Sequence, residues 1–80
     1  MKISVLFFGI TTDLVKASQF STEVEENSSI ANLKTFLKAE FPQLENIDSY
    51  AIAVNEEYAG DEKVLKEDDV VAVIPPVSGG

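Results

Sequence analysis

The sequence predicts a single α+β domain of the β-grasp type, in which one mixed sheet of four to five strands carries one main helix on one face. Three observations predict this fold. The chain of 80 residues is long enough for only one small core. Its alternating apolar segments and its one long helical stripe follow the order hairpin, helix, short strands. A helix placed between a hairpin and later strands, in so short a chain, packs on a single sheet.

The first hairpin is expected over residues 2–8 and 19–24. Residues 2–8 carry apolar side chains on both faces, which predicts a central strand: Ile3, Val5 and Phe7 on one face, and Ser4, Leu6 and Phe8 on the other. Residues 19–24 alternate with Phe20, Thr22 and Val24 on one face, which predicts a half-exposed strand. Residues 11–17 between them are expected to form a short helix, with Thr11 or Thr12 as N-cap and Leu14 and Val15 turned inward.

The main helix is predicted from Ser29, its N-cap, to about Glu40. Apolar residues at helical spacing form one stripe that should pack on the sheet: Ile30, Leu33, Leu37 and Phe41, with Phe36 beside them. Phe41 precedes Pro42, which is a helix stop signal.

The second half of the chain predicts three short strands. Residues 43–49 are expected to be a loop with one helical turn around Leu44 and Ile47, and residues 50–54 a strand. Asn55 and Glu56 form a turn into a short strand around Tyr58. The acidic loop 60–69 is expected to be anchored by its apolar pair, Val64 and Leu65, before the last strand at residues 70–74. In a β-grasp the first and last strands are central, parallel neighbours, so Val71 and Val73 should lie under the helix.

The residues after the last strand predict a protruding tail, and we divide the chain into a domain (1–74) and a flexible C-terminal tail (75–80). Pro75 and Pro76 cannot extend a ladder and favour an extended chain. Six residues follow Ile74, and they can reach roughly 20 Å. Gly79 and Gly80 have no Cβ and would fit a channel too narrow for side chains. The functional interpretation makes the Gly80 carboxylate the reactive group of the protein; the alternative is an inert terminus.

The composition excludes several functions. The chain has no cysteine and no histidine, so it lacks the usual nucleophile, general base and metal ligands, and neither a bound cofactor nor a metal site is expected. The acidic run Glu67–Asp69 lacks the spacing of a calcium loop, so we interpret it as a solvated turn. A net charge of −8 argues against nucleic acid and anionic membranes. It fits either a partner with a basic face or simply a soluble acidic surface. No signal peptide or membrane span is found, and we expect a cytoplasmic protein.

The sheet face opposite the helix is a candidate binding surface. An apolar patch should form there from Leu6, Phe8, Tyr58, Ala72 and Ile74. An exposed apolar cluster on a small domain usually marks a partner surface. The alternative is that loops fold over this face and make it a second small core.

The motif IPPVSGG at residues 74–80 resembles the C-terminal signature of the small, sulfur-carrier subunits of molybdopterin synthase. The resemblance extends over the whole chain, through KISVLFFG at the start, SIANLKTFLKAEFP in the helix, AIAVNEEYA and LKEDDVVAV. It implies a ubiquitin-like fold. One departure is Asp68, which stands where the family usually has a glycine between two acids, and leaves the shape of that turn open.

The resemblance also implies a function without an autonomous active site. An E1-like adenylating enzyme would activate Gly80 with ATP, and a sulfur donor would convert it to a thiocarboxylate. The tail, including Val77, Ser78 and Gly79, would then enter the large synthase subunit, which docks on residues matching Phe8, Tyr58 and Ile74 and on Pro75 and Pro76. Three alternatives stay open: a ubiquitin-like modifier of lysines, a sulfur carrier for thiamine or cysteine synthesis, and an interaction domain with an inert tail.

Overall fold

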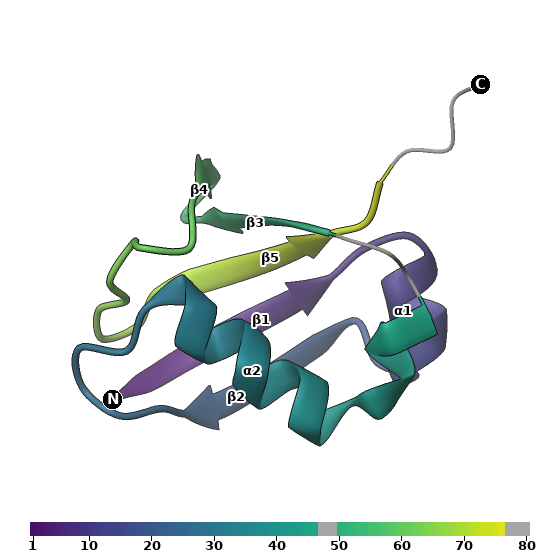
Figure 1. Ribbon diagram of the computed structural model, residues 1–80, viewed down its shortest axis with the longest axis horizontal. Coiled ribbons are helices and arrows are strands. Elements are labelled where there is room, and N and C mark those ends of the chain that lie inside the picture. The colour runs from purple at the N-terminus through teal and green to yellow at the C-terminus, as the bar shows by residue number, and fades with distance from the viewer. Residues whose placement is uncertain (47–49, 77–80) are drawn as a thin grey trace.

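A computed structural model describes residues 1–46 and 50–76 of the chain, and they form one sheet with a helix across one face (Figure 1). The sheet has five strands in the order β2-β1-β5-β3-β4. The elements in chain order are β1 (Lys2–Phe7), α1 (Ile10–Val15), β2 (Gln19–Glu23), α2 (Ile30–Glu40), the 3₁₀ helix η1 (Pro42–Asn46), β3 (Ala51–Val54), β4 (Glu57–Ala59) and β5 (Val70–Ile74). The predicted ubiquitin-like β-grasp is confirmed.

The first and last strands lie side by side at the centre of the sheet. β1 pairs with β5 in parallel and with β2 in antiparallel orientation, while β3 pairs antiparallel with both β5 and β4. The β3–β4 hairpin turns at Asn55 and Glu56, which both have positive φ (50° and 72°), as a tight two-residue hairpin loop requires. The only parallel pair among the described strands therefore joins the two ends of the domain.

The core lies between the sheet and α2. From the sheet it takes the predicted inward residues of β1 and β5, together with Ile52 and Val54 of β3. From the helix it takes Ile30, Leu33 and Leu37, all no more than 1% exposed. Phe41 closes one end, where its ring meets those of Phe7 and Phe20 edge-on, with centroids 5.5 and 5.2 Å apart. The apolar alternation of the strands and the helical stripe thus meet in one layer, as predicted.

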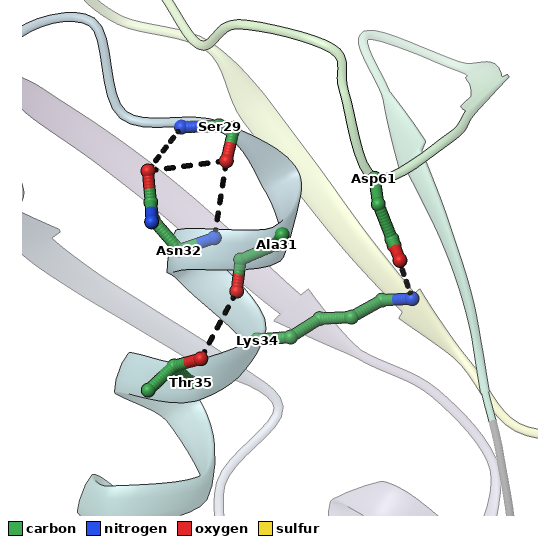
Figure 2. Close-up of polar contacts among 6 residues, drawn as sticks. All are labelled: Ser29, Ala31, Asn32, Lys34, Thr35 and Asp61. Carbon is green, nitrogen blue, oxygen red and sulfur yellow. Dashed lines mark hydrogen bonds and ion pairs between the residues drawn. The ribbon is translucent and has the colours of Figure 1, made fainter.

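The start of α2 is tied to the acidic loop as well as to its own cap (Figure 2). Ser29 is the N-cap: its Oγ accepts a hydrogen bond from Asn32 N at 3.2 Å, and Asn32 Oδ1 accepts one from Ser29 N at 3.0 Å. The first two helical amides, of Ile30 and Ala31, donate to carbonyls of Lys63 and Asp61 in the loop. All amides of the first turn are therefore satisfied, and the loop is held against the helix.

Several boundaries differ from the sequence predictions. β1 ends at Phe7 rather than Phe8, and α1 begins at Ile10 with Gly9 as its N-cap residue, so neither Thr11 nor Thr12 is the cap. Leu14 is only half-buried, whereas Val15 is buried.

Two further expectations concern the loops. Val64 is 45% exposed, so Leu65 alone anchors the acidic loop in the core. Leu44 lies in η1 and is buried as expected, but Ile47 falls outside the described residues. Among residues 1–46 and 50–76, no helix has the length and apolar character needed to cross a bilayer.

Candidate functional site

The tail leaves the sheet at the end of the central parallel pair of strands. Ile74, the last residue of β5, pairs with Ala51 of β3, and Pro75 and Pro76 follow it. Pro75 is half-buried and Pro76 is exposed. Proline has no amide hydrogen and cannot donate to a ladder, which explains why the strand ends here. The other predicted tail residues, Val77, Ser78, Gly79 and Gly80, lie outside the described residues, and their roles stay predictions.

One row of side chains crosses the sheet on the face opposite α2. Leu6 is in register with Ala72, Ala72 with Ala53, and Ala53 with Tyr58. Residues in register on neighbouring strands point to the same face. Leu6 on the central strand β1 and Tyr58 on the edge strand β4 are therefore parts of one surface.

The apolar patch is accessible in the described part of the chain. Tyr58 exposes 76% of its surface and Phe8 exposes 48%, while Leu6, Ala72 and Ile74 are half-buried. Loops of the described part of the chain do not cover Phe8 and Tyr58, because both aromatic side chains remain in contact with water. For these two residues the alternative of a second small core is therefore excluded. That the patch binds a partner stays a prediction.

The exposure of Phe8 is not caused by the alternation of side chains along β1. It lies one residue beyond β1, and its backbone is bonded to Thr11: Phe8 N donates to Thr11 Oγ1 at 3.0 Å, and the same hydroxyl donates to Phe8 O. The turn, and not the pleat of a strand, therefore sets the position of the Phe8 ring.

Sequence reasoning missed two apolar residues of the surface. Val70 is 39% exposed and shares the strand face of Ala72 and Ile74, so alternation along β5 could have found it. Ile10, the first residue of α1, is 53% exposed. A third omission is Gly9, which lies against Pro75 and has no signal in the sequence beyond its lack of a side chain.

The acidic run before β5 is partly structural. Asp69 is only 8% exposed, which corrects its assignment to a solvated turn. Its carboxylate accepts hydrogen bonds from Asn55 Nδ2 at 2.9 Å and from Lys66 N at 2.8 Å, and so joins the β3–β4 turn to the loop before β5. Among the described residues, no three acidic side chains gather closely enough to hold a metal ion.

Comparison with known proteins identifies the family of the chain. The model of the ThiS family matches residues 5–80. The molybdopterin synthase sulfur carrier subunit of Arabidopsis thaliana is 32% identical over 100% of this chain and 84% of its own length. The structure of SAMP1 from Haloferax volcanii has a TM-score of 0.88 at 20% identity, covering all of both chains, and shares the fold.

One chain of a solved two-subunit complex is also similar to this chain. It contains subunits 1 and 2 of the molybdopterin-converting factor from Helicobacter pylori, and the matching chain is 28% identical with a TM-score of 0.72 over 100% of both chains. The family model and these relatives show that the chain belongs to the ThiS family and is a ubiquitin-like relative of the molybdopterin synthase sulfur carrier subunits.

Proposed function

We propose that this chain is the sulfur carrier subunit of a molybdopterin synthase and that sulfur travels on the carboxyl group of Gly80. The observation that carries the proposal is the position of the Gly79–Gly80 motif. In the sequence two residues separate the motif from Pro75 and Pro76, which follow the central strand β5. The last residue of that strand, Ile74, belongs to the apolar patch. The named function of the relatives, which match the whole chain, supports it.

The chemistry needs an activation step. A carboxylate reacts poorly with a sulfur nucleophile because its oxygen is a poor leaving group. Transfer of AMP from ATP to Gly80 makes an acyl adenylate and releases pyrophosphate. If the donor is a persulfide, its terminal sulfur attacks the carbonyl carbon, AMP leaves, and a second thiol reduces the resulting acyl disulfide to the thiocarboxylate while it forms a disulfide with the donor. If the donor is sulfide, the same displacement of AMP gives the thiocarboxylate directly. When the sulfur passes to the pyranopterin precursor, water restores the carboxylate.

Partners must supply most of this chemistry. The sequence has neither histidine nor cysteine and no phosphate-binding loop of the Walker type. In the proposal an E1-like adenylating enzyme activates Gly80, and the large subunit binds the precursor and provides acid and base groups. The Helicobacter pylori complex of subunits 1 and 2 supports a two-subunit assembly.

Intact mass spectrometry tests the carrier role. After incubation with the adenylating enzyme, ATP and a sulfur donor, the mass should rise by the difference between sulfur and oxygen, and fragmentation should place the change at Gly80. Deletion of Gly80, or a C-terminal tag, should abolish the shift while the amide spectrum of the folded domain stays unchanged. Sulfur transfer by a protein that keeps its tag would refute the proposal, and a ladder of lysine conjugates would indicate a modifier instead.

Gly79→Val tests the narrow channel that the proposal assumes in the partner. The core residues named above all precede Pro75, so the substitution should leave the melting temperature unchanged. The added side chain should block sulfur transfer, because a channel that admits only backbone excludes a branched Cβ. The matched control is Gly60→Val, at a glycine whose added Cβ would meet no atom within 4 Å. Full transfer by Gly79→Val would show that the glycines are incidental.

A further inference from the structure

The turn that follows β1 lies directly against the root of the tail. Gly9 has φ 55° and ψ −137°, a conformation that residues with a side chain rarely adopt. A Cβ at this position would lie 3.0 Å from Cγ and 3.8 Å from Cδ of Pro75. Carbon atoms pack best at about 3.5–4.0 Å, so the shorter contact would be repulsive. The ring of Pro75 therefore occupies the space that a side chain at Gly9 would need.

The turn itself is firmly held. Thr11 is fully buried, and its hydroxyl bonds both the amide and the carbonyl of Phe8. The hydroxyl of Thr12 donates to the carbonyl of Phe7 at 3.0 Å. The turn is thus fixed to the end of β1 and to the first turn of α1, and it cannot easily move away from Pro75.

Pro75 is constrained from the other side. It follows Ile74, which is held in the sheet by its pairing with Ala51. Its own ring fixes φ at about −65°, so little rotation is available where the chain leaves the strand. Pro75 is half-buried although Pro76, the next residue, is exposed. Two stiff parts of the molecule therefore meet at the contact between Gly9 and Pro75.

We propose that Gly9 is a positioning residue: because it has no side chain, the ring of Pro75 can lie on the turn, and this contact sets the direction in which the tail leaves the sheet beside Phe8. A rotation of about 20° at Pro75 would move the end of a fully extended tail of about 20 Å by roughly 7 Å. The consequence for sulfur transfer rests on the proposed function. The role of the Gly9–Pro75 contact in directing the tail does not depend on that function.

A spin label tests the geometry without any partner. The chain has no cysteine, so Ser78→Cys gives one site for a nitroxide. Amide signals of the Phe8–Thr12 turn and of β3 are then compared between the parent, Gly9→Ala and Gly60→Ala, the last being a matched control with open space at its Cβ. We expect Gly9→Ala to change the pattern of paramagnetic broadening and Gly60→Ala to leave it unchanged. The same pattern in all three proteins would overturn the proposal.

A double variant separates the contact from backbone strain at Gly9. The single variant Pro75→Ala keeps the test valid if Gly9→Ala folds poorly, because it removes the ring without straining the turn, and it should by itself change the broadening pattern. In a Pro75→Ala background the ring is gone, so adding Gly9→Ala should change the broadening pattern no further. If Gly9→Ala alters the pattern equally in both backgrounds, the contact does not set the tail direction, and the inference is overturned.

The kinetic test uses unlabelled proteins and the large subunit. For Gly9→Ala, single-turnover sulfur transfer should slow by about tenfold or more, because small misplacements of a reacting group carry large rate penalties. Its affinity for the large subunit should stay within about threefold of the parent, since the apolar patch is retained, and Gly60→Ala should change neither quantity. An unchanged transfer rate would overturn the link to catalysis. If the parent itself forms no thiocarboxylate, the proposed function fails, while the broadening experiment still decides the role of Gly9.

Discussion

At the scale of single residues, the neighbours Phe7 and Phe8 show how the first strand divides core from surface. Phe7 is 2% exposed and its ring packs against Phe41, whereas Phe8 is 48% exposed. Alternation along the strand predicted these opposite environments. It could not predict that the strand ends between the two residues, because the hydrogen bonds of Thr11 to Phe8 depend on how α1 folds back.

Phe7→Ala and Phe8→Ala should therefore behave oppositely. Phe7→Ala should destabilise the domain by about 3–5 kcal/mol, because it leaves a cavity in the core. Phe8→Ala should hardly change stability, and it should weaken binding to the large subunit by about thirtyfold, as loss of an interface anchor worth about 2 kcal/mol would. Urea denaturation and a binding titration on both variants measure these effects. A large loss of stability in Phe8→Ala with none in Phe7→Ala would mean that the patch is the true core.

Tyr50 makes a prediction about alkaline pH. Burial raises the pKa of its phenol above 10.0, and the negative charge of Asp61 raises it further. The folded protein then holds this proton more tightly than the unfolded chain does, so the stabilisation is present below pH 10 and is lost as the pH rises through the raised pKa.

Absorbance of the phenolate measures that shift. The chain has two tyrosines, so the Tyr58→Phe variant reports Tyr50 alone, and its midpoint should lie above 10.0. Tyr50→Phe should lose less stability on going to alkaline pH than Tyr58→Phe does. A midpoint at or below the usual value would contradict the partial burial of the phenol and the influence of the Asp61 charge.

At the scale of elements, the start of α2 was the most predictable feature, because a serine cap is a local signal. The sequence does not show that loop carbonyls satisfy the two following amides, since that contact joins residues about 30 positions apart. The same contact explains why an acidic segment with one apolar anchor, Leu65, adopts a defined path. Lys34 adds an ion pair with Asp61 at 2.8 Å (Figure 2), which is partly exposed and contributes little.

Ser29→Ala measures the contribution of the cap. The substitution removes the side-chain acceptor for Asn32 N and should destabilise the protein by about 1 kcal/mol. Ser21→Ala is the control, because Ser21 lies exposed on the edge strand β2 and makes no side-chain hydrogen bond within the described residues. Thermal or urea denaturation gives both values. Equal effects of the two substitutions would mean that the loop carbonyls alone hold the start of the helix.

α1 was predicted less well, for a physical reason. Its cap position is Gly9, which makes no side-chain hydrogen bond, and Thr11 bonds backward to Phe8 from inside the helix. Sequence rules identify caps by residue type, so they favoured the threonines. With Gly9 at the cap position the turn also lies against Pro75, a contact between the two ends of the domain that no local rule describes.

At the scale of the whole molecule, the order of the elements was enough to predict the sheet and its central parallel pair. Alternation along β5 was enough to place Ala72 and Ile74 on the face opposite α2, whereas the roles of Gly79 and Gly80 stay predictions. The contact at Gly9 was not predictable, because it arises only when β1 and β5 become neighbours. The site is therefore a product of this pairing, which brings the first turn of the chain to the root of its tail.

The net charge of −8 gives a last prediction, about how quickly the proposed complex forms. Charges complementary to a basic partner accelerate encounter, and salt screens them over about 10 Å at 0.1 M. The association rate constant with the large subunit should fall by about tenfold between about 0.05 M and about 0.5 M salt, while dissociation, governed by apolar contacts, should change little.

Two matched substitutions show whether this attraction is local to the Tyr58 edge of the apolar patch. Glu57 precedes Tyr58 on the edge strand β4, with its side chain on the α2 face because it is in register with Val54. Glu23 lies on β2 at the opposite edge, four strand spacings or roughly 19 Å from Tyr58. Glu57→Gln and Glu23→Gln change the net charge equally. Because screening weakens the more distant charge, Glu57→Gln should slow association more than Glu23→Gln in stopped-flow measurements at about 0.1 M salt. Faster association after removal of Glu57 would indicate that the partner presents an acidic face, and the orientation proposed for the complex would have to be abandoned.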